Sequence, residues 1–152
     1  FPDAQLVFML RHPCDVVLSC HMQAFGLNGG ALAFETLDST ARTYAQLMDW
    51  WHEQQARVNL SVLEVRHEDL VDEPVATLRS VFGFLRLPVV DDLEDRLDAA
   101  QPGRIRTPSY AQVTRPLNRA GVGRWQRYRA HFSAQALDLL APWVRRLGYS
   151  LE

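Results

Sequence analysis

The sequence predicts an α/β fold in which a parallel β-sheet is flanked by helices. Two mostly apolar segments, 6–10 and 60–65, are separated by a long stretch with helical periodicity, and each is followed by Arg-His. Consecutive parallel strands require a crossover, which is usually a helix. An uninterrupted apolar run is typical of a strand covered on both faces. Because 152 residues suit one domain, we expect a single α/β domain.

The first predicted strand, Leu6–Leu10, delivers Arg11 to its carboxyl end. Pro13 suits the first turn of a helix, and Asp15 lies near the positive end of that helix. The helix is expected to run to about Gln23, before a glycine-containing loop. Open α/β sheets bind ligands at the carboxyl edge of their strands. Arg11 is therefore our first candidate anion-binding residue.

Apolar residues at helical spacing predict three of four further helices, and the fourth, 91–98, is expected to be a short acidic helix with a solvated face. Their expected ranges are 35–57, 74–86, 91–98 and 133–147. Ser133 has the residue type of an N-cap for the last helix, and a glycine follows that helix.

Two strands are too few for a sheet with both faces covered. We therefore expect partner strands outside this chain, or other cover for the sheet. The chain opens at Phe1 without an initiator methionine, and we expect it to belong to a longer protein. Trp50 and Trp51 are expected to pack against the sheet rather than to offer a stacking surface.

Positive charge is concentrated in one part of the chain. All 16 basic residues are arginine, although the net charge is −2. The segment Ala99–Leu137 contains no acid. Its arginines are Arg104, Arg106, Arg115, Arg119, Arg124, Arg127 and Arg129. Such a field attracts anions, and a guanidinium binds two oxyanion oxygens at once. Phosphate or sulfate binding is one interpretation; a solvated arginine surface is the other.

Several chemistries find no support in the sequence. A phosphate-binding loop of the G-x-x-x-x-G-K-[ST] type requires a lysine, and the chain has none. No metal-ligand spacing and no catalytic triad is recognisable. Cys14 and Cys20 would lie roughly 9 Å apart in a helix, beyond the limit of about 7 Å for a disulfide. We therefore expect free thiols in a reducing, cytoplasmic compartment. We expect no bound metal. We also expect no membrane segment, because no apolar run approaches the roughly 20 residues needed to cross a bilayer.

Four segments, in order, resemble motifs of sulfotransferases that use 3′-phosphoadenosine 5′-phosphosulfate (PAPS). Leu10–Ser19 resembles the 3′-phosphate-binding segment, and Val65–Pro74 the second signature, Y-E-D-L. Arg106–Asn118 is similar to a loop of tyrosylprotein sulfotransferases and of bacterial sulfotransferases fused to tetratricopeptide repeats. Arg119–Trp125 resembles the loop that closes over the nucleotide. The resemblance implies a P-loop NTPase-like sulfotransferase fold, present only in its C-terminal part.

The resemblance also implies residue roles. Arg11 and Ser19 match the pair that holds the 3′-phosphate. His67 stands where the family usually has a tyrosine beside the adenine.

Three more residues match positions near the nucleotide phosphates. Ser109 and Arg115 lie in the third segment, and Arg119 matches the basic residue of the closing loop. The family's 5′-phosphosulfate loop and catalytic base would precede Phe1, so residues 1–152 would form one partial domain with no assigned catalytic residue.

The resemblance implies transfer of a sulfuryl group from PAPS to a hydroxyl or amine of an acceptor whose class the sequence does not reveal. Tetratricopeptide repeats upstream and no nucleic-acid partner are expected. The alternative is a non-catalytic nucleic-acid-binding module. Its basis is segment 104–129, where arginines alternate with Tyr110, Trp125 and Tyr128.

Overall fold

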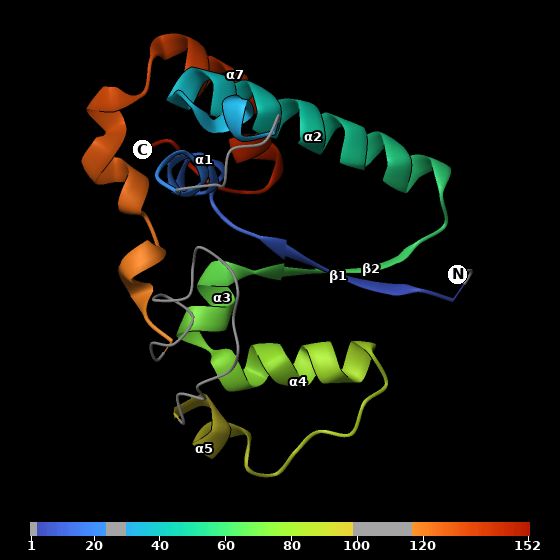
Figure 1. Ribbon diagram of the computed structural model, residues 1–152. Helices are drawn as coiled ribbons and strands as arrows, with labels where there is room; N and C mark the ends of the chain where they lie inside the picture. Colours follow the sequence, from blue (N-terminus) through green and yellow to red (C-terminus); the bar gives the residue numbers. More distant parts are fainter. Residues whose placement is uncertain (1–2, 24–29, 99–116) are drawn as a thin grey trace. The chain divides into compact units, whose positions relative to one another are not determined.

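The computed structural model describes residues 3–23, 30–98 and 117–152 (Figure 1). It combines helices with a small parallel sheet, as the sequence predicts at the level of fold class.

The chain divides into two compact units. The strand unit comprises Phe1–Arg11 and Leu60–Ala120, and the helical unit comprises His12–Asn59 and Gly121–Glu152. The boundary after Arg11 separates the first strand from the helix that follows it.

The sheet of the strand unit consists, in the described residues, of two strands (Figure 1). β1 (Gln5–Leu10) pairs in parallel with β2 (Ser61–Arg66). The register runs from Gln5 opposite Ser61 to Leu10 opposite Arg66. This confirms the parallel pair predicted from the two apolar segments.

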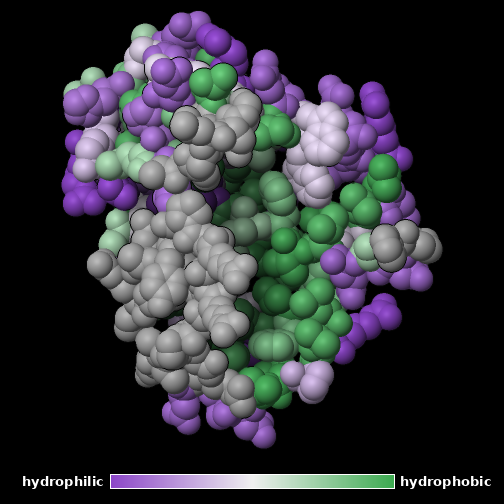
Figure 2. All heavy atoms as spheres, in the orientation of Figure 1, coloured by the Kyte–Doolittle hydropathy of each residue, from purple (hydrophilic) through white to green (hydrophobic). Residues whose placement is uncertain are grey.

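Within the described residues β1 is not covered on both faces, so the described part of the chain does not supply the cover that the apolar pattern predicts. Leu6, Val7 and Met9 are 38%, 37% and 49% exposed. Apolar side chains outside β1 are also exposed on the surface of the protein (Figure 2). The physical reason is that β1 pairs with one strand only, while helices of the strand unit pack against β2.

Three helices follow β2 in the strand unit. They are α3 (His67–Asp72), α4 (Pro74–Phe84) and α5 (Leu93–Asp98). α4 and α5 lie where the sequence predicts helices. α3 is not predicted, because it begins directly at the end of the strand with no side-chain cap at Arg66. Glu68 and Asp69 in its first turn favour the positive helix end.

The helical unit packs three helices with 3₁₀ turns. The helices are α1 (Pro13–His21), α2 (Leu37–Arg57) and α7 (Ala134–Arg146). The turns are η1 (Ala31–Phe34) and η3 (Arg124–His131), and the short η2 (Arg119–Gly121) lies at the unit boundary. The core of the helical unit is formed by residues of α1, α2, α7 and η3, together with the residue that follows η3. These residues are Cys14, Val17, Leu18, Ala41, Trp125, Phe132, Ala136, Leu140 and Val144.

The helix ends follow local sequence rules. Ser133 accepts a hydrogen bond of 3.0 Å from the Ala136 N–H, which confirms its predicted N-cap role. Gly148 follows α7 with a φ of 72°, a conformation that glycine adopts without strain. Thr36 and Ser39 form a capping box at the start of α2.

Trp50 does not pack as expected, since it is 58% exposed on α2. The buried positions of α2 are Thr40, Ala41, Ala45 and Met48. These mostly small side chains allow α2 to approach α1 and α7, which leaves the larger ring outside.

Candidate functional site

The carboxyl edge of the sheet brings together two of the predicted nucleotide-binding residues. Leu10 and Arg66 are paired across the two strands. Arg11 and His67 directly follow the last residues of β1 and β2, so the chain leaves the sheet through them at the same edge. Both side chains are half-buried, which suits groups that bind a ligand while touching the protein. This position agrees with the rule that ligands bind where parallel strands end.

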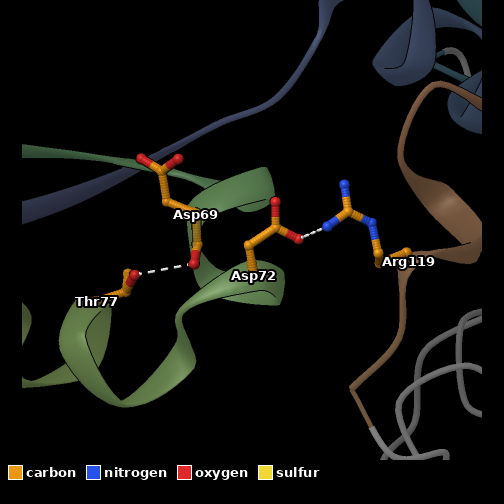
Figure 3. Close-up of polar contacts among 4 residues, drawn as sticks. All are labelled: Asp69, Asp72, Thr77 and Arg119. Carbon is orange, nitrogen blue, oxygen red and sulfur yellow. Dashed lines mark hydrogen bonds and ion pairs between the residues drawn. The ribbon is translucent and has the colours of Figure 1, made fainter.

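Helix α3 links this edge to Arg119. His67 is its first residue, and Asp72, its last, forms an ion pair with the Arg119 guanidinium (Figure 3). The hydroxyl of Thr77 donates to the Asp69 carbonyl at 3.1 Å, which ties α4 to α3 (Figure 3). Asp72 is a residue that the sequence reasoning missed, because no local pattern shows which arginine a surface carboxylate will meet.

Ser19 lies on another unit. It is half-buried in the last turn of α1, in the helical unit, whereas Arg11 closes the first segment of the strand unit. The pair is therefore split by the unit boundary. Ser109 and Arg115 lie outside the described residues, as does Tyr110 of the alternative interpretation.

His12 organises the start of α1. It is 8% exposed, and its Nδ1 accepts a hydrogen bond of 3.2 Å from the Cys14 N–H. Its Nε2 then carries the proton and donates to the Ser150 carbonyl at 2.8 Å. The ring also stacks on Trp125, with centroids 5.0 Å apart and an interplanar angle of 19°. His12 is thus a structural cap.

Asp15 is the main functional candidate that sequence reasoning did not find. Its carboxylate is 1% exposed. One oxygen accepts from the Gly123 N–H and the other from the Trp125 N–H, each at 2.8 Å. The sequence indicated only a favourable charge near a helix start. The signal that could have found it is an acidic residue at a buried position of α1, because a buried carboxylate requires hydrogen-bond donors.

Comparison with known proteins gives the family. Residues 1–92 match the family model described as "Sulfotransferase family". The chain belongs to the sulfotransferase family. The match includes Arg11, Ser19 and His67, and ends before Arg119.

This sulfotransferase-family chain is also similar to an uncharacterized protein of Aquifex aeolicus (strain VF5). The two are 24% identical over 151 residues, which make up 97% of this chain and 19% of that protein. The chain therefore spans about a fifth of the length of that relative.

The Cys14 thiol of this sulfotransferase-family chain is buried and unreactive. Burial, with a smaller contribution from the negative charge of Asp15, raises the pKa of Cys14 to about 12. The thiol stays protonated and is a poor nucleophile. Cys14 and Cys20 are not joined by a disulfide, as the spacing predicts.

Among residues 3–23, 30–98 and 117–152, no cluster of His, Cys, Asp or Glu is suited to hold a metal ion. In the same ranges no helix has both the length and the apolar character to cross a bilayer.

Proposed function

We propose that this chain supplies the 3′-phosphate-binding part of a PAPS-dependent sulfotransferase. In the proposed reaction the bond between sulfur and the 5′-phosphate oxygen breaks, and a bond forms from sulfur to a hydroxyl or amine of the acceptor. The acceptor proton passes to a base that we do not assign to any residue of this chain. The observation that carries the proposal is the pairing of Leu10 with Arg66 in a member of this family, which puts Arg11 and His67 at one sheet edge.

Each proposed contact has a physical basis. The Arg11 guanidinium would pair with two oxygens of the 3′-phosphate. The Ser19 hydroxyl would donate one further hydrogen bond. The His67 imidazole can stack on the adenine or hydrogen-bond to it. These contacts are remote from the sulfur, so they would contribute binding energy rather than chemistry.

The phosphate charge would be neutralised by side chains rather than by a metal ion. We assign Ser109, Arg115 and Arg119 to the nucleotide phosphates, with the acid-free arginine segment adding a positive field. Arg119 pairs with Asp72, so a bound phosphate would compete with that carboxylate for the guanidinium.

Three wider expectations belong to the same proposal. The fold would be the P-loop NTPase-like fold of sulfotransferases, represented here by its C-terminal part. The branch would be that of tyrosylprotein and tetratricopeptide-associated bacterial enzymes, with tetratricopeptide repeats upstream in the longer protein. The compartment would be reducing and cytoplasmic.

The nucleic-acid alternative is less well supported by the described aromatic residues. Trp125 is 1% exposed and stacks on His12. The Arg129 guanidinium lies 5.4 Å from its ring centroid, and that of Arg124 lies 5.7 Å from the Tyr128 centroid. Both guanidinium groups therefore lie beside aromatic rings of the same fold, and the buried Trp125 ring cannot serve as a platform for bases.

The test is a thermal shift with 3′-phosphoadenosine 5′-phosphate, using the protein with its natural termini. The nucleotide should raise Tm, and Arg11→Ala should abolish the rise. Arg79→Ala is the matched control, because it removes an exposed arginine from α4 in the same unit. A full rise in Arg11→Ala rejects the role of Arg11. No rise in the unchanged protein rejects the proposed function.

A further inference from the structure

A buried carboxylate joins two segments that are far apart in the sequence. Asp15 lies in the first turn of α1, and the groups it binds, Gly123 and Trp125, lie 108 and 110 residues later. All three residues belong to the helical unit. Removing a carboxylate from water is costly unless donors replace the water. Here both oxygens have a backbone donor at 2.8 Å.

The geometry of the turn depends on this carboxylate. Gly123 has a φ of 63° and a ψ of 15°, in the left-handed region. A left-handed residue beside right-handed ones turns successive N–H groups toward a common point, which forms a concave anion-binding surface. In this turn the Asp15 carboxylate is the anion: the Gly123 N–H donates to one of its oxygens and the Trp125 N–H to the other. Without it, the Gly123 and Trp125 N–H groups would lose these acceptors.

Ring contacts of Trp125 hold the same turn. The Trp125 ring stacks on His12 and meets the edge of Phe132, with centroids 6.3 Å apart. His12 caps α1 and is adjacent to Arg11 in the chain. Asp15 and His12 therefore fasten one turn to the start of the helix that carries Ser19.

We propose that Asp15 is a positioning residue that fixes the turn Gly121–Trp125 against α1 for donor binding. This inference rests on the proposed function, in which Ser19 of α1 contacts the nucleotide, and on the resemblance of Arg119–Trp125 to the loop that closes over it. Asp15 does not touch the nucleotide. It acts by holding the backbone of the turn in one conformation.

The first variant is Asp15→Asn, which keeps the size of the side chain. The amide retains one acceptor oxygen and presents an NH₂ group to the second backbone N–H. Loss of one charge-assisted hydrogen bond should weaken binding of 3′-phosphoadenosine 5′-phosphate by roughly ten- to hundredfold. Titration calorimetry on the protein with natural termini measures this change.

The matched control is Thr36→Ala. The Thr36 hydroxyl caps α2 by accepting a hydrogen bond of 3.0 Å from the Ser39 N–H. Its removal destabilises the same unit without changing a contact of the turn Gly121–Trp125. Nucleotide affinity in this control should stay within about twofold of the unchanged protein, although Tm falls. This comparison separates positioning from general loss of stability.

A second variant covers the case in which Asp15→Asn does not fold. Gly123→Ala strains the turn because alanine disfavours the positive φ of this residue. The strain does not come from a clash, since the nearest atom to an added Cβ, Gln126 Oε1, is at an ordinary 3.7 Å. It should weaken nucleotide binding in the same direction. Gly123→Asn should weaken it less, because asparagine tolerates the left-handed region.

Each result decides the proposal. Weaker binding in the folded variants of Asp15 and Gly123, with the Thr36→Ala control unaffected, supports it. Unchanged affinity in those variants overturns it and leaves Asp15 a purely structural group. Absence of binding by the unchanged protein overturns the proposed function, and this inference with it.

Discussion

At the scale of single residues, the ion pair with Asp72 would compete with a bound phosphate for the Arg119 guanidinium. Their side chains are 66% and 40% exposed. Exposed ion pairs contribute only about 0–1 kcal/mol because water and salt screen them. A phosphate can therefore displace the carboxylate at small cost.

Asp72→Asn should favour nucleotide binding. Removing the competing charge should tighten binding of 3′-phosphoadenosine 5′-phosphate by up to about fivefold, as measured by calorimetry at low salt. Asp69→Asn is the matched control, since it removes an exposed carboxylate from the same helix but not the partner of Arg119. An equal gain in both variants would mean that net charge, not the pair, is responsible.

Cys14 makes the stability of the protein depend on alkaline pH. Its pKa is raised from 9.0 to about 12 in the folded chain, so above about pH 9 the unfolded state releases a proton that the folded state keeps. Its contribution to stability is complete below pH 9 and is lost as pH rises toward 12, by at most about 1.4 kcal/mol per pH unit. Urea unfolding at a series of pH values measures this slope. Cys14→Ala should make the slope shallower; an unchanged slope would contradict the assignment.

The residue scale also shows the limits of sequence reasoning. Arg11 could be proposed from the sequence because it directly follows an apolar strand, whereas His67 was proposed from the family resemblance. The strand register then brings the two residues to one edge. Asp15 could not be proposed, because its partners lie 108 and 110 residues away and are backbone N–H groups, which carry no side-chain signature.

At the scale of elements, boundaries were predictable wherever a local signal marks them. Pro13, Ser133 and Gly148 fix ends of α1 and α7. α3 has no cap, and η3 has no helical apolar stripe, so neither was predicted. Their positions depend on contacts between residues far apart in the sequence, such as the hydrogen bond from the Trp125 N–H to Asp15.

α7 contains a local conflict that can be tested. Pro142 lies inside the helix and is exposed. A proline there supplies no N–H for the helix and crowds the preceding turn. Pro142→Ala should stabilise the protein by on the order of 1 kcal/mol, which corresponds to a rise in Tm of about 3 °C.

The control for that variant is Pro74→Ala. Pro74 is at the start of α4, where its missing N–H would have no helical partner. Its replacement should therefore give no gain in Tm. A gain at Pro74 equal to that at Pro142 would show that the effect is not one of position in the helix.

At the scale of the whole molecule, the family and the general α/β class agree with the sequence-based expectation. Full cover of the sheet was not found in the described residues, because β1 meets only one strand there. Hydrophobic pattern predicts that a strand will be buried, but it does not say which chain segment buries it.

The central claim is recognition of a 3′-phosphate at the edge where Arg11 and His67 leave the sheet. Its most direct test compares 3′-phosphoadenosine 5′-phosphate with adenosine 5′-phosphate by titration calorimetry, in the unchanged protein and in Arg11→Ala. The account predicts a preference for the 3′-phosphorylated nucleotide that collapses roughly ten- to hundredfold in Arg11→Ala. Equal affinity of the unchanged protein for both nucleotides, or a preference that survives the substitution, would contradict it.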